Sequence, residues 1–237
     1  MRASRPIHHD SLADMVYQGL FDDMVNGRLR PGQRLTEQEI SQARGISRAP
    51  VREAIARLAV DGLLRLVPRS GCYVCRLSER DIQHIFDLRV RLETLALDYA
   101  FDVFDQVQLA QLRAKLVACQ GRAERRLLRD EEPLDTLFHA TILNAAASPL
   151  LQDLLGKLLA RIRVFQAIGS RDPGKARDAL ENHVALLVVI IAGDRRTARR
   201  RLQQHLEVAR NNAVGLAAFF SGNADPPPFP ETENHKP

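Results

Sequence analysis

The stretch GISRAPVREAIARL, residues 45–58, has helical periodicity with two dissimilar faces. At 100° per residue, one arc of about 100° is wholly apolar. That arc holds Val51, Ala54, Ile55 and Leu58. The opposite face presents Arg48 and Arg52 beside the small side chain of Ala49. The first face predicts packing against a core, and the second predicts a close-fitting anionic partner.

The segment before this helix, residues 36–45, predicts a second, shorter helix followed by a tight turn. Thr36 and Glu39 form a capping box that opens a short helix, and Gly45 is expected to end it. Ser47 is then expected to cap the quoted helix, with Pro50 in its first turn, where a missing N–H costs little. Two helices joined by a tight glycine turn predict a helix-turn-helix.

The flanking segments complete a winged helix-turn-helix. A helix is expected over residues 11–26, and LLRLVPRSGCYVCRL, residues 63–77, alternates around a P-R-S-G turn that is typical of a hairpin. The third helix of this fold enters the DNA major groove. Arg48 and Arg52 are then placed to read guanine edges, and Arg69 and Ser70 at the hairpin tip are placed to reach phosphate or the minor groove. Any basic amphipathic helix has a similar face, but the order of four elements argues against that alternative.

The composition agrees with a DNA-binding protein and argues against a secreted or a membrane-spanning one. The 237 residues carry a net charge of +5, and residues 1–76 alone hold twelve arginines, no lysine and eight acidic residues, which places most of the excess there. Three cysteines and no recognisable signal peptide predict a reducing cytoplasm. Cys72 and Cys75 point to opposite faces of the expected strand, which disfavours a metal or redox pair. No apolar run is long enough to span a membrane.

The second part of the chain is expected to be all helical. The periodicity predicts six helices near residues 78–103, 105–129, 131–146, 149–168, 173–192 and 194–220, with breaks that include Pro133 and Pro149. The fold class is therefore mainly α: a winged helix-turn-helix domain over 1–77, a six-helix bundle over 78–220, and a Pro-rich disordered tail over 221–237.

Four side chains of the second domain are candidates for a metal site. Asp135 and His139 are four residues apart and project from one face of a helix, while His183 and His205 lie on the apolar faces of two others. Imidazole nitrogens with a carboxylate suit a divalent transition metal, Zn²⁺ or Ni²⁺. The alternative is three hydrogen-bonded core histidines.

Residues 27–74 resemble the DNA-binding domain of the GntR family of bacterial transcription regulators. The motif S-R-x-P-V-R-E-A-I-x-R-L, followed by D-G-L and P-x-x-G, carries the resemblance. It implies operator contacts at Arg48, at Arg52 and at the wing around Gly71, whereas Gln38 stands where some members have an arginine. The full predicted DNA-binding set is Ser47, Arg48, Ala49, Pro50, Arg52, Arg69, Ser70 and Gly71.

Residues 78–218 resemble the FCD ligand-binding domain of the FadR subfamily of this family, through DIQHIFDLRVRLE, DTLFH, ENH and QQHL. The resemblance implies a metal held by Asp135, His139, His183 and His205, and a small carboxylate effector bound beside it. It places Arg89 toward the effector, although an i, i+4 pair with Glu93 explains Arg89 equally well. Asn144 and Arg163 are the other candidate effector residues. Six helices favour the VanR group of that subfamily.

The expected function is a cytoplasmic, homodimeric transcriptional regulator, a repressor or an activator, that binds operator DNA and is controlled by a small carboxylate. It is not expected to be an enzyme or to bind a membrane. Three alternatives remain open at this point: a regulator for which the metal ion is itself the signal, a metal-dependent enzyme fused to a DNA-binding domain, and a helical half that serves only for dimerisation.

Overall fold

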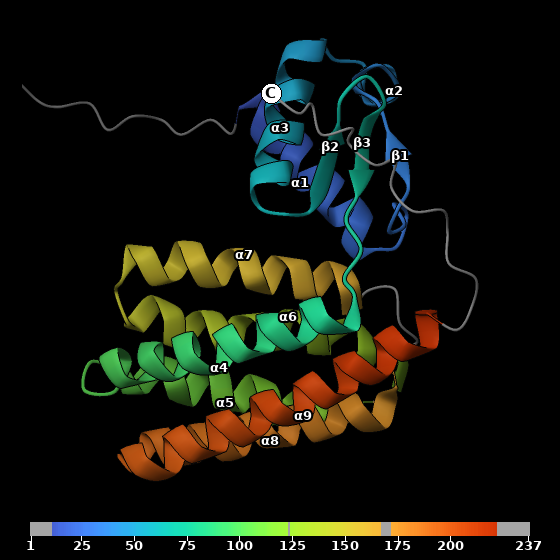
Figure 1. The fold of residues 1–237 in the computed structure, drawn as a ribbon. Helices are drawn as coiled ribbons and strands as arrows, with labels where there is room; N and C mark the ends of the chain where they lie inside the picture. The colour runs from blue at the N-terminus through green and yellow to red at the C-terminus, as the bar shows by residue number, and fades with distance from the viewer. Residues whose placement is uncertain (1–10, 123, 167–171, 222–237) are drawn as a thin grey trace, which may run out of the picture. The chain divides into compact units, whose positions relative to one another are not determined.

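A computed structural model of the chain describes residues 11–122, 124–166 and 172–221. It is mainly helical (Figure 1) and divides into two compact units. Within the described residues, the first unit contains 11–76 and 160–166, and the second contains 77–159 and 172–221, apart from residue 123. The loose arm expected over residues 1–9 and the tail expected over 221–237 lie outside the described residues, except Ser221.

The first unit begins with three helices whose ends follow local signals. They are α1 (Leu12–Val25), α2 (Glu37–Arg44) and α3 (Arg48–Val60). Capping boxes open α1 and α2, and Gly45 ends α2 in the left-handed conformation with φ of 64°. The apolar stripe predicted for α3 is wholly buried and packs against α1, α2 and the sheet.

A small antiparallel sheet completes this unit (Figure 1). Strands β2 (Leu64–Val67) and β3 (Gly71–Val74) form the predicted hairpin, with Leu64 opposite Val74 and Val67 opposite Gly71. The two-residue strand β1 (Arg34–Leu35) pairs with the other edge of β3 and was not predicted. Gly71 has φ of 107°, and an added Cβ would lie 2.8 Å from the Leu35 carbonyl oxygen, so the wing requires glycine there.

The second unit is built from helices whose apolar faces form one aliphatic core. In the described ranges these are α4 (Glu79–Ala100), α5 (Gln106–Gln120), α6 (Glu124–Ala145), α7 (Pro149–Gln166), α8 (Pro173–Ile191) and α9 (Arg195–Ser221), six in number as expected. Helix α4 packs against α6 and α9, and α8 packs against α5, α6 and α9. These contacts bring one face each of α4, α6, α8 and α9 to a common interior.

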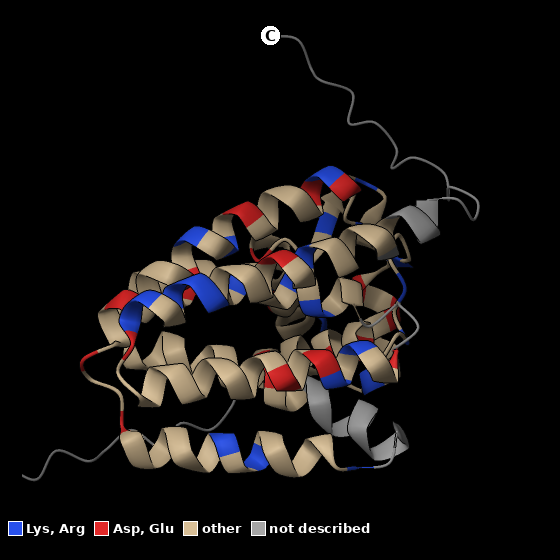
Figure 2. Ribbon diagram, turned by 90° about the horizontal axis from the view of Figure 1, so that it is seen from below, with Lys and Arg blue, Asp and Glu red and all other residues tan. Residues whose placement is uncertain are grey.

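Charged residues of the helices are mixed in sign rather than gathered by sign, as Figure 2 shows. Two ion pairs connect α9 to α4 and to the turn that follows it: Arg199 with Asp98 of α4, and Arg195 with Asp102 of the turn, each at 2.5 Å. Both pairs have exposed members, so each contributes little to the free energy of folding. The buried apolar faces therefore supply most of the stability of this unit.

Two sequence predictions about helix ends are wrong. Pro133 was expected to separate two helices, but it lies inside α6, and α5 ends earlier, at Gln120 before Gly121. The helix continues through the proline because Phe138 and Ile142, beyond it, are anchored in the core, and this packing outweighs the local cost. Ser47 occupies the capping position of α3, but its side chain makes no capping hydrogen bond.

Two further observations concern the cysteines and the membrane. Cys72, Cys75 and Cys119 all lie in the described part of the chain and form no disulfide. Burial raises the pKa of the Cys72 thiol to about 11, which keeps it protonated and unreactive at neutral pH. None of the helices in the described ranges is both long and apolar enough to cross a membrane.

Candidate DNA-binding surface and metal site

The predicted DNA-binding residues lie on the recognition helix α3, at its start, and on the wing. Ser47, the residue that precedes α3, is exposed. In the first turns of α3, Arg48, Ala49 and Arg52 are exposed and Pro50 is half-buried. Arg48 and Arg52 therefore present their side chains to solvent, one helical turn apart. Arg48 and Arg52 are thus accessible to a nucleic acid, as a major-groove helix requires, although Arg52 also pairs with Glu37.

The wing is fixed by its own hydrogen bonds. Arg69 and Gly71 are exposed at the hairpin tip, and Arg69 has the unusual φ of 61°. The Ser70 hydroxyl lies 2.7 Å from the Tyr73 hydroxyl, and Arg34 Nε donates to the Ser70 carbonyl oxygen at 2.5 Å. The turn is thus held from both sides, and Arg69 stands at its exposed tip.

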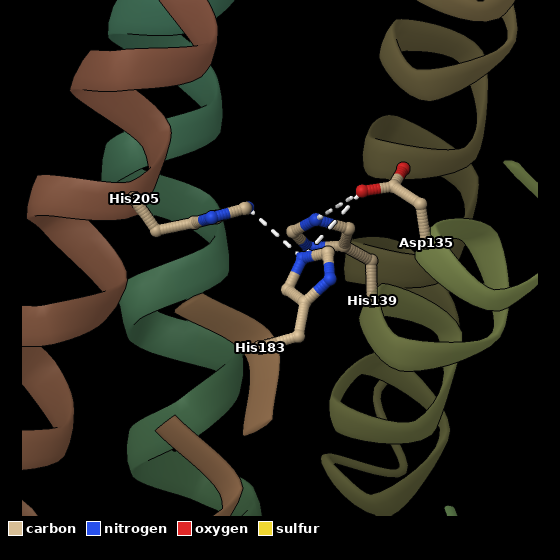
Figure 3. Close-up of side chains that lie close together, drawn as sticks. All are labelled: Asp135, His139, His183 and His205. Atoms are coloured by element: carbon tan, nitrogen blue, oxygen red, sulfur yellow. Dashed lines mark hydrogen bonds and ion pairs between the residues drawn. The ribbon is translucent and has the colours of Figure 1, made fainter. Parts of the chain in front are cut away.

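Asp135, His139, His183 and His205 form a compact cluster inside the second unit (Figure 3). One atom from each side chain lies within 4.8 Å of the corresponding atom of every other. Helix α6 supplies two of the residues, and α8 and α9 supply one each. The three histidines are buried, whereas the Asp135 side chain keeps 35% of its surface exposed, so this carboxylate lies at the solvent edge of the cluster.

The distances within the cluster suit a shared ion. Nε2 of His183 lies 3.1 Å from Nε2 of His205 and 3.5 Å from Oδ1 of Asp135, and Nε2 of His139 lies 3.7 Å from the same oxygen. Ligands bound at about 2.0–2.1 Å in a tetrahedron are separated by about 3.4 Å. These three separations are close to the tetrahedral value, and all four donor atoms lie within 4.8 Å of one another.

Burial keeps two of the histidines in the form that binds metal. It lowers the pKa of His183 and of His205 well below the usual value, and the neighbouring histidines lower both further. Both rings are therefore neutral at pH 7 and retain a lone pair, as a metal ligand must. Nδ1 of His183 is buried and has no hydrogen-bond partner among the described atoms, so Nε2 makes the polar contacts of that ring.

Glu93 of α4 supports the cluster from behind and was missed as a partner of His139. Its Oε2 lies 2.6 Å from Nδ1 of His139, and its Oε1 accepts a hydrogen bond from Arg89 Nε at 2.7 Å. Burial opposes ionisation of Glu93, but Arg89 and His139 outweigh it and lower the pKa. The carboxylate is therefore charged. It accepts a hydrogen bond from the Nδ1–H group of His139, so that Nε2 of this ring faces the cluster.

The three candidate effector residues have different surroundings. Arg89 is buried and makes the i, i+4 pair with Glu93, with its guanidinium 4.9 Å from the centre of the Phe86 ring. Asn144 is exposed on α6. Arg163 belongs to the part of α7 grouped with the first unit, where its guanidinium lies 5.2 Å from the centre of the Phe21 ring. Arg89 is linked to the cluster through Glu93.

The fold and these surfaces define a winged-helix DNA-binding protein with a helical second domain. Residues 12–74 match the family model for bacterial regulatory proteins of the gntR family, and residues 84–208 match that for the FCD domain. The chain therefore belongs to the GntR family and carries an FCD domain.

Relatives and a solved structure agree with this assignment. The chain is 28% identical over 192 residues to the HTH-type transcriptional repressor RspR of Escherichia coli, covering 81% of this chain and 84% of that protein. It is 25% identical over 194 residues to the transcriptional regulator YdhC of Bacillus subtilis, with 80% and 85% covered. The structure of E. coli McbR/YncC has the same fold, with a TM-score of 0.74, 24% identity, and 90% and 100% of the two chains covered. The chain is thus a transcriptional regulator with a GntR DNA-binding domain and an FCD domain.

Proposed function

We propose that this regulator is a cytoplasmic homodimer in which a small carboxylate, bound at a metal site in the helical domain, controls operator binding. Residues 1–77 bind DNA, and residues 78–220 bind the effector and dimerise. The observation that carries the proposal is the cluster of three buried histidines and one carboxylate with metal-ligand spacing. His183 and His205 are buried and have each other's Nε2 as partner, and a metal ion would give both nitrogens a stronger partner in these apolar surroundings.

Asp135, His139, His183 and His205 would hold the ion, and Zn²⁺ or Ni²⁺ suits this donor set. When bound, it would supply a Lewis-acidic position for a carboxylate oxygen. Asp135, at the solvent edge, lies where a ligand enters. The Glu93 bond occupies Nε of Arg89, so a carboxylate would pair with the Nη1 and Nη2 edge of that guanidinium.

Regulation requires the effector to prefer one arrangement of the two DNA-binding domains, since a ligand that binds both arrangements equally shifts nothing. A two-fold symmetric dimer reads a pseudo-palindromic operator, so the separation of its recognition helices decides affinity. The related E. coli RspR is named a repressor, and we propose the same mode here, with the effector releasing DNA.

The test measures DNA affinity of the full chain on a duplex selected by the protein from a randomised pool. Metal-loaded protein, metal-stripped protein and the H183A/H205A variant are each titrated with a panel of small carboxylic and hydroxy acids. We expect an acid that changes the Kd at least 10-fold in the loaded protein only, a coupling of about 1.4 kcal/mol. A response to metal alone would make the ion the signal, and no response to any acid would overturn effector control.

Replacing Glu93 by glutamine is expected to weaken metal binding by roughly 10–100-fold, because partners that orient a ligating histidine have effects of that size. A chelator competition measures the affinity on protein shown to be folded by circular dichroism, since Arg89 also loses its buried partner. Glu79→Gln, an exposed change on the same helix, is the control. Equal affinities for the two variants would contradict the role of Glu93.

A further inference from the structure

Glu37, the first residue of α2, is joined to the recognition helix by a bidentate ion pair. Arg52 Nε donates to Oε1 of Glu37 at 2.9 Å, and Arg52 Nη2 donates to Oε2 at 2.9 Å. The Arg52 side chain keeps 70% of its surface exposed and that of Glu37 keeps 35%. An ion pair this exposed contributes little to folding stability, so its main effect is on the direction of the guanidinium.

The geometry of the pair leaves a defined part of Arg52 for DNA. A guanidinium has five N–H groups in one rigid plane, arranged as two forks. Glu37 occupies the fork formed by Nε and Nη2. The second fork, formed by Nη1 and the remaining proton of Nη2, is the one that fits the O6 and N7 atoms of guanine.

We propose that Glu37 is a specificity-determining residue, which holds Arg52 so that its second fork reads a guanine in the operator. This inference concerns the DNA-binding surface and goes beyond the proposed control by a metal-bound carboxylate. Its failure would leave the metal site untouched. A pre-set guanidinium loses less rotamer freedom on binding, which favours the one register in which the fork meets guanine.

If Glu37 affected DNA binding only through its charge, its removal would strengthen binding, whereas its role in holding Arg52 predicts weaker binding to the operator. The Arg52 hydrogen bonds lower the pKa of Glu37 against a small opposing effect of burial, and Arg48 lowers it further, so the carboxylate is ionised at neutral pH. A negative charge on the DNA-facing surface repels phosphate, and its loss should tighten binding to every sequence. A carboxylate that merely masks Arg52 from DNA makes the same prediction. The sign of the change on a preferred sequence therefore separates positioning from repulsion and masking.

The experiment compares wild-type protein with Glu37→Gln and Glu37→Ala on two duplexes, one selected by the wild type from a randomised pool and one with the same bases shuffled. We expect binding to the selected duplex to weaken roughly 10-fold, the size of one guided guanine contact. Binding to the shuffled duplex should stay the same or tighten. Glu53→Gln, an equal charge change at an exposed site of α3, should leave the ratio of the two affinities unchanged.

A double variant at positions 37 and 52 shows whether Glu37 affects the ratio of the two affinities by holding Arg52. In an Arg52→Ala background, Glu37→Ala should no longer change the ratio of the two affinities, because no guanidinium remains to be held. Equal tightening on both duplexes by Glu37→Gln would overturn the proposal in favour of repulsion or masking. A fall in the ratio that persists in the Arg52→Ala background would overturn it as well, since Glu37 would then act without Arg52. Thermal unfolding of each variant verifies that all remain folded.

Discussion

The protein with both Arg48 and Arg52 replaced by alanine should bind its selected operator at least about 100-fold more weakly than wild type. Each bidentate contact between arginine and guanine contributes about 1–3 kcal/mol of discrimination, and the proposed dimer would present both residues twice. Both side chains are exposed on α3, away from the buried stripe that packs the domain. The loss should therefore appear in DNA affinity and not in folding.

Fluorescence anisotropy at one stated salt concentration measures this effect, because phosphate contacts make every DNA affinity depend on salt. The double variant should retain weak binding that does not distinguish the operator from a shuffled duplex. Arg113→Ala with Arg201→Ala, which removes the same charge from exposed sites of α5 and α9, is the control. Unchanged operator affinity in the Arg48 and Arg52 variant would show that α3 does not read DNA.

Removing metal from the wild-type protein should lower its melting temperature by roughly 10 °C. An ion present at about 1,000 times its Kd stabilises the folded state by about 4 kcal/mol, and 1 kcal/mol shifts the melting temperature of a chain of this size by about 2–4 °C. The ion would join α6, α8 and α9, which meet at the cluster. Metal also satisfies the buried histidine nitrogens that otherwise have one another as partners.

Differential scanning calorimetry with and without a chelator gives the shift. His183→Ala with His205→Ala should abolish it, since the variant has lost two of four ligands. That variant also loses the stacking of His183 on Phe138, whose ring centres are 4.2 Å apart, so its melting temperature is lower at the start. His84→Ala, at an exposed site of α4, should keep the full shift. A wild-type melting temperature indifferent to the chelator would contradict a structural metal.

Local signals in the sequence predicted most of the first unit. The capping box predicted at Thr36 involves residues three apart, and Gly45 and Gly71 mark backbone conformations that glycine favours. Such features depend on neighbouring residues and are therefore readable from the chain alone. Strand β1 was missed because two residues carry no periodicity, and only their pairing with β3 makes them a strand.

The second unit shows where local signals mislead. A proline is a strong local argument for a break, yet α6 continues through Pro133 because the residues after it are held by the core. Tertiary packing decided this boundary, and no window of sequence around Pro133 contains that information. Gly121, which directly follows α5, was a better signal than Pro133 for the break between α5 and α6.

The sequence predicted the four members of the aspartate–histidine cluster but not the residue that supports it. The i, i+4 spacing of Asp135 and His139 and the inward faces of the other two helices placed four donors toward one interior. Glu93 meets His139 across 46 positions of sequence, and Glu37 meets Arg52 across 15. Both are pairings between helices, so only the packed fold reveals them. Glu93 had one sequence signal, a charge on the inward face of α4, which requires a buried partner.

Metal content of the purified protein, measured by elemental analysis beside the His183→Ala and His205→Ala double variant, tests the central claim most directly. Four converging donors predict about one divalent ion per chain in the wild type and none in the variant. The expected ion is zinc or nickel, retained through gel filtration. Wild-type protein that holds no metal after incubation with Zn²⁺, Ni²⁺ and Mn²⁺ would contradict the account and make the three histidines a hydrogen-bonded core or a direct effector pocket.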